Sequence, residues 1–379
     1  MPRPTMLINW GYYFAVGHVV EALKIAHGYV AKMPDLEVHL ILPQQAPADL
    51  ARASPAVSRV YTVNPYAIAQ EGESSIALAC IPRVFDYVVE YDFPEGPAPP
   101  AIAPFAELFE RRFLARRWKG SSNDRYVLPE GGQPEYDFNA TVSLTLPDAA
   151  RFASPMNDHR GPKIALLLAG GGGAGAYPSL GFWQRMCAAI RREFPDVRFA
   201  LTGQSGAERR GTYTSSYPRA AVNALFDADA ELVDAYDIGL WRQLGLIAEC
   251  DMLISPHTGF SFLAPCVGTP WLALSGGHWS EYLMNGRPFY CVLPRCERYP
   301  CRGFIKPECR VKYGGDDYFE CMSDRALEPK IAEIVAGVRK LKDPSFSYEM
   351  AVAEHLERVQ KGTLRHDAFR FFDWWQAKD

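Results

Sequence analysis

Three consecutive residues, His257, Thr258 and Gly259, follow an apolar segment (252–255) that has the pattern of a buried strand. We expect a short helix to begin directly after Thr258, and the first amides of a helix have no acceptor within it. Those amides carry a partial positive charge that attracts phosphate. The hydroxyl group of Thr258 can donate a hydrogen bond to phosphate, and Gly259 lets the backbone approach it closely. The pattern predicts a phosphate site. The alternative is that Thr258 only caps the helix and that His257 is a partly buried loop residue.

A second candidate, His18, lies in the turn between an apolar segment at 6–10 and a segment with helical periodicity. Imidazole titrates near neutral pH, so His18 is suited to act as a general base. We expect Tyr12, Tyr13 and Gly17 to contact the molecule that gives up the proton. The alternative is a histidine that contacts only its own helix or a neighbouring loop.

A glycine-rich turn at 170–175 follows the apolar segment 163–168 and precedes a predicted helix at about 178–193. A dinucleotide-binding turn occurs in this setting, so an NAD-type oxidoreductase is one alternative. The next predicted strand, 197–203, does not end in the acidic residue that would hold a ribose, which counts against this alternative. We interpret the turn as a flexible floor for a ligand, although it could simply be a loop with unusual dihedral angles.

Five of the nine cysteines lie within 291–321. Four of them, Cys296, Cys301, Cys309 and Cys321, could hold a structural zinc or iron ion tetrahedrally. Their spacing lacks the Cys-x-x-Cys pairs of common zinc sites. Reduced core thiols, or one or two disulfides, therefore stay open as alternatives, although no secretory signal favours disulfides.

The elements that must position these residues alternate between strand and helix. The expected strands lie at 6–10, 37–43, 57–63, 163–168, 197–203, 252–255 and 270–276, and a segment at 231–237 precedes a predicted helix. Such alternation implies parallel sheets of βαβ units, whose ligands bind beyond the carboxyl ends of the strands. We therefore predict an α/β protein with two Rossmann-like, doubly wound domains that face a central cleft.

A polar stretch at 148–162 separates two halves of similar length. We predict an N-terminal domain at 1–158, a C-terminal domain at 159–345 that includes the cysteine-rich segment 291–321, and a helical tail at 346–379. The tail could pack back across both domains.

The 379 residues carry a net charge of −4, which argues against a dedicated nucleic-acid binder. The long uncharged runs at 164–184 and 252–279 contain Gly and Pro, so we expect no membrane span. The N-terminus lacks a convincing cleavage site, and we predict a cytoplasmic protein. A basic helix predicted at 105–119 could be a solvated surface or could contact a membrane or an anionic acceptor.

Three segments resemble the ADP-heptose glycosyltransferases of bacterial lipopolysaccharide assembly, which have the GT-B architecture. The segment "ISPHTGFSFLAPCVGTPWLALSG" is similar to the family's strand, Asp-Thr/Ser-Gly, small helix and Gly-x-Pro. The segment "AVGHVVEALKIAHGYV" resembles the Met-Gly-Asp turn and first helix of the family. The segment "AYPSLGFWQRMCAAIRREFPDVRFALTG" resembles the family's Trp-Pro…Trp helix and the strand that follows it. Some members of the wider family also have a cysteine cluster at the corresponding place.

The resemblance implies an inverting glycosyltransferase that needs no cofactor for catalysis. It would move a sugar from a nucleotide-diphospho-sugar donor to a glycan, protein or small-molecule acceptor. His18 stands where the family has its catalytic Asp, and His257 where the family has an acid near the donor. The donor contacts that we expect are Gly171, Gly172, Gly173, Gln204, Glu208, His257, Thr258 and Gly259.

The sequence also departs from the family pattern. Phe262 replaces a family His, and the glycine-rich turn lacks the Lys that pairs with the diphosphate. Arg209, Arg210 or Arg219 could supply that charge. Because of these departures, a non-catalytic sugar-nucleotide-binding protein is a further alternative.

Overall fold

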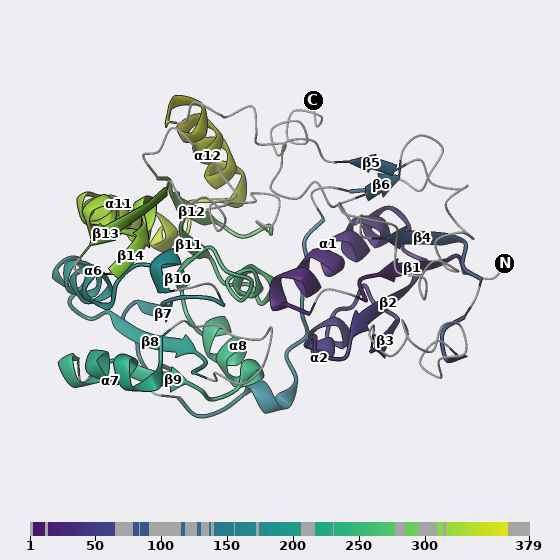
Figure 1. Cartoon of the computed structure of the whole chain (residues 1–379), viewed down its shortest axis with the longest axis horizontal. Helices are drawn as coiled ribbons and strands as arrows, with labels where there is room; N and C mark the ends of the chain where they lie inside the picture. The colour runs from purple at the N-terminus through teal and green to yellow at the C-terminus, as the bar shows by residue number, and fades with distance from the viewer. Residues whose placement is uncertain are drawn as a thin grey trace. The chain divides into compact units, whose positions relative to one another are not determined.

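The computed structural model describes residues 3–11, 14–64, 79–82, 84–90, 115–117, 127–129, 136–137, 140–154, 156–171, 174–205, 217–229, 231–276, 285–294, 309–313 and 316–362. These residues form two compact units (Figure 1), and the chain passes from one to the other between Thr145 and Leu146. We call them unit 1 and unit 2. None of the described helices has the length and apolar character that crossing a lipid bilayer requires.

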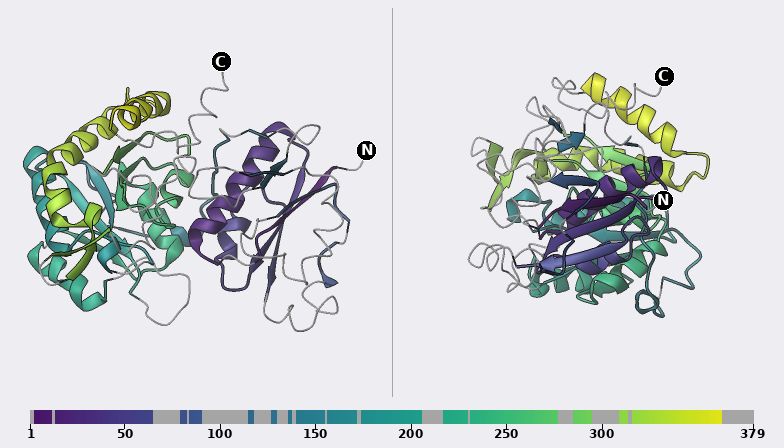
Figure 2. Two further views of the ribbon diagram at one scale, coloured as in Figure 1. Left: turned by 45° about the horizontal axis from the view of Figure 1, so that its top comes forward. Right: turned by 90° about the vertical axis from the view of Figure 1, so that its right-hand side faces the viewer.

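Unit 1 contains a four-stranded parallel sheet in the order β3-β2-β1-β4. Its elements are β1 (Thr5–Asn9), α1 (Val16–Lys32), β2 (Glu37–Pro43), α2 (Ala48–Arg52), β3 (Arg59–Val63) and β4 (Tyr87–Glu90). Strands β1 and β2 are buried along nearly their whole length, as is usual for inner strands covered on both faces. Figure 2 shows α1 and α2 together on one face of this sheet. Helix α1 buries Val19, Leu23 and Ala26, which recur at helical spacing.

The strands predicted in the N-terminal half, at 6–10, 37–43 and 57–63, are confirmed to within two residues of their ends. The helix predicted at 105–119 is wrong in its last part, because β5 (Ala115–Arg117) pairs antiparallel with β6 (Val127–Pro129). Residues 105–114 lie outside the described part of the chain. The aromatic and aliphatic residues that suggested a helix all precede Ala115, and local periodicity carries no information on pairing with a later segment.

Unit 2 contains a six-stranded parallel sheet in the order β12-β11-β10-β7-β8-β9. Its strands are β7 (Lys163–Leu167), β8 (Arg198–Gly203), β9 (Val233–Tyr236), β10 (Met252–Pro256), β11 (Trp271–Leu274) and β12 (Phe289–Val292). Its longer helices are α6 (Leu180–Glu193), α7 (Arg219–Ala228), α8 (Leu240–Ala248), α11 (Ile331–Lys342) and α12 (Tyr348–Gly362). The strands predicted between 163 and 276 are confirmed, whereas β9 and β12 were not predicted as strands. The α/β class is therefore confirmed, with parallel sheets in both units.

The strand order of unit 2 places a topological switch point between β7 and β10. From β7 the chain adds β8 and then β9 on one side, and it then returns to add β10, β11 and β12 on the other side. Loops that leave two neighbouring strands in opposite directions open a crevice at their carboxyl ends, and ligands of open α/β sheets bind there. The loops that follow β7 and β10 contain the glycine-rich turn and the His-Thr-Gly sequence.

The C-terminal helices close one side of unit 2. Helix α11 packs on β11 and β12 beside α6. A Cβ atom on Gly337 of α11 would lie 2.6 Å from the Tyr290 ring, so a glycine allows this close approach. Arg358 of α12 donates to the carbonyl of Cys291 at 2.8 Å and stacks over Tyr290 at 4.4 Å. The described part of the predicted tail is therefore docked on unit 2, and residues 363–379 lie outside the described part.

The chain leaves unit 1 earlier than the predicted boundary at 158. The polar stretch at 148–162 belongs to unit 2, where the short helix η2 (Asp148–Ala150) packs on α8. Gly245 of α8 has no side chain to block the Ala150 carbonyl. A polar composition therefore suggested a linker, but specific packing makes the first part of this stretch a component of unit 2.

Candidate functional site

The glycine-rich turn and the His-Thr-Gly sequence meet at the switch point of unit 2. A Cβ atom on Gly170 would lie 2.8 Å from Cβ of Thr258 and 2.8 Å from Oη of Tyr177. Real Cβ atoms do not approach other atoms so closely, so the contact between these two loops requires a glycine at position 170. Gly171 follows as an exposed residue, while Gly172 and Gly173 lie outside the described residues.

The helix expected directly after Thr258 is wrong. Residues 259–262 form a turn, and helix α9 (Leu263–Cys266) begins only at Leu263. Thr258 caps the turn, because both its carbonyl and its Oγ1 atom accept from the amide of Ser261, at 3.1 and 3.4 Å. Gly259 is partly exposed, whereas Phe260 and Ser261 are buried. Thr258 therefore caps this turn, whereas the N-cap of α9 is Phe262, so the amides at this edge belong to a turn rather than to a helix.

A buried network of hydroxyl groups holds this turn. Trp271 Nε1 donates to Ser255 Oγ at 2.8 Å, and Ser255 Oγ donates to Ser261 Oγ at 2.7 Å. Ser261 Oγ in turn donates its only proton to the carbonyl of Pro256 at 2.9 Å. Thr258 Oγ1 lies 3.0 Å from Ser261 Oγ and must therefore be the donor in that contact. In this arrangement the Thr258 hydroxyl donates to Ser261 within the protein.

His257 is 8% exposed and packs against two aromatic rings. Its ring centroid lies 5.0 Å from that of Phe262 in an edge-to-face arrangement and 6.2 Å from that of Trp271. The position at which the family pattern has a His is therefore occupied here by a ring that packs on His257. The structure places His257 at the carboxyl edge, at the end of β10, but largely covered.

Hydrogen bonds on either side of Gln204 hold the start of the loop after β8. The side-chain amide of Gln243 forms two hydrogen bonds with the backbone of Gly203, of 3.2 and 2.7 Å. Ser205 donates from its amide and its hydroxyl to the carboxylate of Asp237, at 2.7 and 2.6 Å. Gln204 lies between these two anchors, whereas Glu208 lies outside the described residues. Sequence reasoning did not single out Gln243 or Asp237, since neither belongs to a short motif.

Arg219 was a candidate for the missing positive charge. Its guanidinium pairs with Asp234 and donates to Asn223 at 2.9 Å. The hydrogen bond that Arg219 donates to Asp234 is the main cause of a raised Arg219 pKa. Its charge is thus held at the end of the sheet beside β9. Arg209 and Arg210 lie outside the described residues.

His18 lies in the first turn of α1 in unit 1. Its Nδ1 atom is 2.6 Å from Oε2 of Glu21, one turn further along the same helix. The His18 side chain is 27% exposed and that of Glu21 only 8%. Gly17 is buried within the helix, and Tyr12 and Tyr13 lie outside the described residues. Sequence reasoning missed Glu21, although its spacing of three residues from His18 is visible in the sequence.

Two of the four candidate metal ligands belong to the described residues. Cys309 directly precedes β13 (Arg310–Tyr313) and Cys321 lies just after β14 (Asp316–Phe319), and these strands pair antiparallel with Arg310 opposite Phe319. The pairing therefore brings both thiols to the open end of one hairpin. Cys296 and Cys301 lie outside the described part, and the described residues contain no group of three or more metal-ligating side chains.

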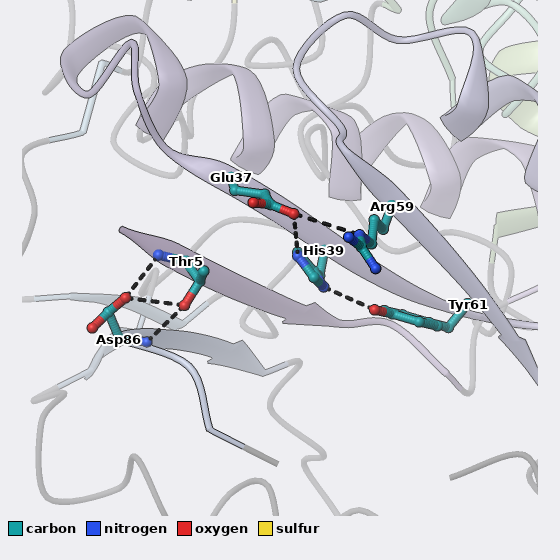
Figure 3. Close-up of polar contacts among 6 residues, drawn as sticks. All are labelled: Thr5, Glu37, His39, Arg59, Tyr61 and Asp86. Carbon is teal, nitrogen blue, oxygen red and sulfur yellow. Dashed lines mark hydrogen bonds and ion pairs between the residues drawn. The ribbon is translucent and has the colours of Figure 1, made fainter. Parts of the chain in front are cut away.

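A polar cluster at the opposite edge of unit 1 was not predicted from the sequence. In Figure 3, His39 lies between Glu37 and Tyr61, with Nε2 3.0 Å from the carboxylate and Nδ1 2.9 Å from the phenol. Asp86 accepts from the amide of Thr5 at 2.8 Å and ties the start of β1 to the residue that precedes β4. Because the cluster lies at the amino ends of the strands, we interpret it as structural.

Comparison with known proteins gives a likeness of fold. No protein-family description and no curated protein sequence matches the chain. The ADP-heptose lipopolysaccharide heptosyltransferase II of E. coli has a TM-score of 0.54 and 14% identity, over 89% of this chain and 99% of that one. The E. coli heptosyltransferase WaaC with ADP has a TM-score of 0.52 and 13% identity, over 87% of this chain and 99% of that one.

A glycosyltransferase family 9 protein from Veillonella parvula has a TM-score of 0.51 and 11% identity, over 88% of this chain and 99% of that one. The resemblance to heptosyltransferases that was expected from three segments is therefore confirmed as a resemblance of fold along most of the chain.

Proposed function

We propose that this protein is a glycosyltransferase that moves a sugar from a nucleotide-diphospho-sugar to an acceptor hydroxyl with inversion at the anomeric carbon. The contact of Gly170 with Thr258 carries the proposal, because it brings two backbone loops together at the switch point where sheets of this kind bind nucleotides. The likeness of fold to the heptosyltransferases supports it.

In this proposal unit 2 binds the donor. The backbone around Gly171 and Gly259 would approach the diphosphate, and the amides of the turn that Thr258 caps would donate to it. The hydroxyl of Thr258 would hold the turn rather than touch phosphate, because its proton is committed to Ser261. The remaining proposed donor contacts are Gly172, Gly173, Gln204, Glu208 and His257.

Unit 1 would bind the acceptor, with Tyr12, Tyr13 and Gly17 near its hydroxyl group. His18 would take the hydroxyl proton while the oxygen forms a bond to the anomeric carbon. The bond from that carbon to the diphosphate would break, and the electron pair would leave on phosphate. A reaction of this kind requires that the carboxyl edges of the two sheets face a shared cleft, which is part of the proposal.

The proposal needs no cofactor for this step and includes a cytoplasmic location. A zinc or iron ion on Cys296, Cys301, Cys309 and Cys321 would have a structural role. The pairing of β13 with β14, which brings Cys309 and Cys321 to one end of the hairpin, supports this part of the proposal. Metal analysis of the purified protein tests this part, and less than about half an ion per chain would contradict it.

The test of the donor site is a Gly170→Ala variant. We expect a nucleoside diphosphate to raise the melting temperature of the wild type, because a ligand that binds only the folded state stabilises it. The added Cβ would push Thr258 and Tyr177 away, so the variant should bind at least about tenfold more weakly. Gly181→Ala is the matched control, because its Cβ would lie no closer than 3.0 Å to another side-chain atom, Nη1 of Arg185.

Equal affinity in both variants would contradict the proposed donor site. Stabilisation by NAD but not by nucleoside diphosphates would favour an oxidoreductase instead. Donor binding without hydrolysis or transfer would favour a non-catalytic binding protein.

A further inference from the structure

We infer that Glu21 is a positioning residue for His18: its carboxylate accepts the Nδ1 proton of the imidazole and holds the lone pair on Nε2. The consequence for catalysis rests on the proposed function. The state of the imidazole itself can be measured without turnover.

The geometry of the pair is that of a strong, directed hydrogen bond. The distance of 2.6 Å from Nδ1 to Oε2 is short for a contact between nitrogen and oxygen, as charge-assisted hydrogen bonds are. Both residues belong to α1, one turn apart, so the helix backbone sets their separation. A carboxylate accepts hydrogen bonds and cannot donate one, so the proton of this contact belongs to Nδ1.

Burial distinguishes this pair from an ordinary surface ion pair. Exposed pairs contribute little, because water solvates both partners. Here the Glu21 side chain is only 8% exposed, whereas that of His18 is 27% exposed. A buried carboxylate needs its donor, so Glu21 favours one ring orientation of His18 over the others. Glu21, which orients the imidazole ring, is thus buried, whereas His18, the proposed base, is partly exposed.

The second His–Glu pair of unit 1 shows what a structural arrangement looks like. His39 contacts Glu37 through Nε2 and Tyr61 through Nδ1, and all three residues belong to β2 or β3 (Figure 3). Its side chain is 5% exposed, and that of Glu37 is 32% exposed. The exposure is therefore reversed relative to the His18–Glu21 pair, and we assign no proton transfer to His39.

The chemical role follows from the fixed tautomer. In a neutral imidazole one nitrogen carries the proton and the other the lone pair, and a hydrogen bond at the first determines which. With its proton on Nδ1, His18 can accept a proton from an acceptor hydroxyl at Nε2. The imidazolium that forms would be stabilised by Glu21, as a carboxylate stabilises the histidine of a hydrolase triad.

The test measures the tautomer and the reaction in the full-length chain. The protein is labelled with ¹⁵N-histidine, and long-range proton–nitrogen spectra are recorded, with His18 assigned from a His18→Gln variant. We expect the Nδ1–H tautomer in the wild type and loss of this preference in Glu21→Gln. We also expect kcat to fall about 10- to 100-fold with unchanged affinity for nucleoside diphosphate.

Two further variants control for folding and for charge. Glu37→Gln removes the carboxylate of the other pair and should leave the His18 tautomer and kcat unchanged. Glu21→Asp keeps the charge and should restore much of the tautomer preference, which covers the case in which Glu21→Gln does not fold.

An unchanged tautomer in Glu21→Gln would overturn the inference, and so would a changed tautomer with full kcat. Failure of the proposed function is seen separately, in a wild type that neither binds a nucleoside diphosphate nor transfers a sugar.

Discussion

At the scale of single residues, the hydroxyl network beneath the His-Thr-Gly turn decides which atoms a ligand can reach. The indole N–H of Trp271 donates to the Ser255 hydroxyl, and the hydroxyl groups of Ser255 and Thr258 both donate to that of Ser261. The Ser261 hydroxyl donates to the Pro256 carbonyl. Counting their protons leaves Thr258 Oγ1 as a donor to Ser261. In the proposed function, Thr258 therefore supports the backbone that binds phosphate and does not contact phosphate through its own hydroxyl group.

The variant Thr258→Val tests this assignment. We expect the free energy of unfolding to fall by about 1–2 kcal/mol, because a buried hydrogen-bonded hydroxyl is lost. The affinity for a nucleoside diphosphate should change less than about threefold, since backbone amides carry the contact. Urea unfolding and titration calorimetry measure the two quantities.

Thr202→Val is the control for stability alone, because its buried hydroxyl donates to the Leu166 carbonyl at 2.9 Å beneath the site. A tenfold or larger loss of affinity in Thr258→Val alone would show that its hydroxyl does touch the ligand.

Buried histidines make the stability of the protein depend on pH. Burial lowers the pKa of His27 from 6.5 to about 4 and that of His355 to about 3. Each is neutral when folded and binds a proton more readily when unfolded, so the unfolded state takes up protons first as the pH falls. Their stabilising effect is complete above about pH 6.5 and is lost progressively toward the folded-state pKa values.

We therefore expect each histidine to account for about 2 kcal/mol of lost unfolding free energy between pH 8 and pH 5. In His355→Gln, this loss should shrink by that amount, as measured by urea unfolding at the two pH values. His159→Gln is the control, because this side chain forms its contact at an exposed site. The same pH dependence in His355→Gln and in the wild type would contradict the assignment.

At the scale of elements, glycines determine how closely helices and loops approach the sheet of unit 2. Gly203, with a φ of 146°, leaves room for the Tyr236 ring at the end of β8. Gly337 lets α11 lie against β12, and Gly170 lets two loops meet. These positions are far apart in the sequence from the residues that require them to be glycine. Their roles therefore become visible only when the elements are packed.

The pair Gly337→Ala and Gly181→Ala tests close packing against helix propensity. Both positions are helical, so alanine should gain about 0.5–1 kcal/mol at each from propensity alone. At Gly337 the Cβ would lie 2.6 Å from Tyr290 and 3.1 Å from Leu272. We expect a net loss of about 1–2 kcal/mol there and a neutral or stabilising effect at Gly181. Equal unfolding free energies for the two variants in urea would contradict this reason for α11 packing.

At the scale of the whole molecule, the chain forms two parallel α/β units, and the proposed donor contacts all belong to unit 2. Strand order decides this assignment, because the switch point between β7 and β10 brings the loops at 168–171 and 257–260 to one edge. His18 and Glu21 belong to unit 1. In the proposed function, unit 2 therefore supplies the donor-binding residues and unit 1 supplies the base.

Hydrogen exchange of the full chain tests this division. We expect a nucleoside diphosphate to slow exchange in peptides that cover 168–171 and 257–260, because bound amides exchange only when the ligand leaves. Peptides that cover β1 to β4 should be unaffected in the absence of an acceptor. Protection of the β1–β4 peptides, with none at the loops of unit 2, would contradict the assignment.

The sequence by itself determined the class of the fold and most of its strands. Apolar runs such as 163–168 and 252–255 became β7 and β10, because a strand buried on both faces needs a continuous apolar segment wherever it lies in the sheet. It also predicted that the loops after β7 and β10 lie close together, because the carboxyl ends of parallel strands lie at one edge of the sheet. The sequence did not predict strands that lack local periodicity, such as β5.

Only the tertiary structure decided what the candidate residues contact. The donation by the Thr258 hydroxyl depends on Ser261 and the Pro256 carbonyl, and the need for glycine at 170 depends on Thr258. The orientation of His18 depends on a carboxylate whose burial cannot be read from its spacing. Hydrogen bonding and close packing join residues that are distant in the chain, so local patterns select the candidates and three-dimensional contacts assign their roles.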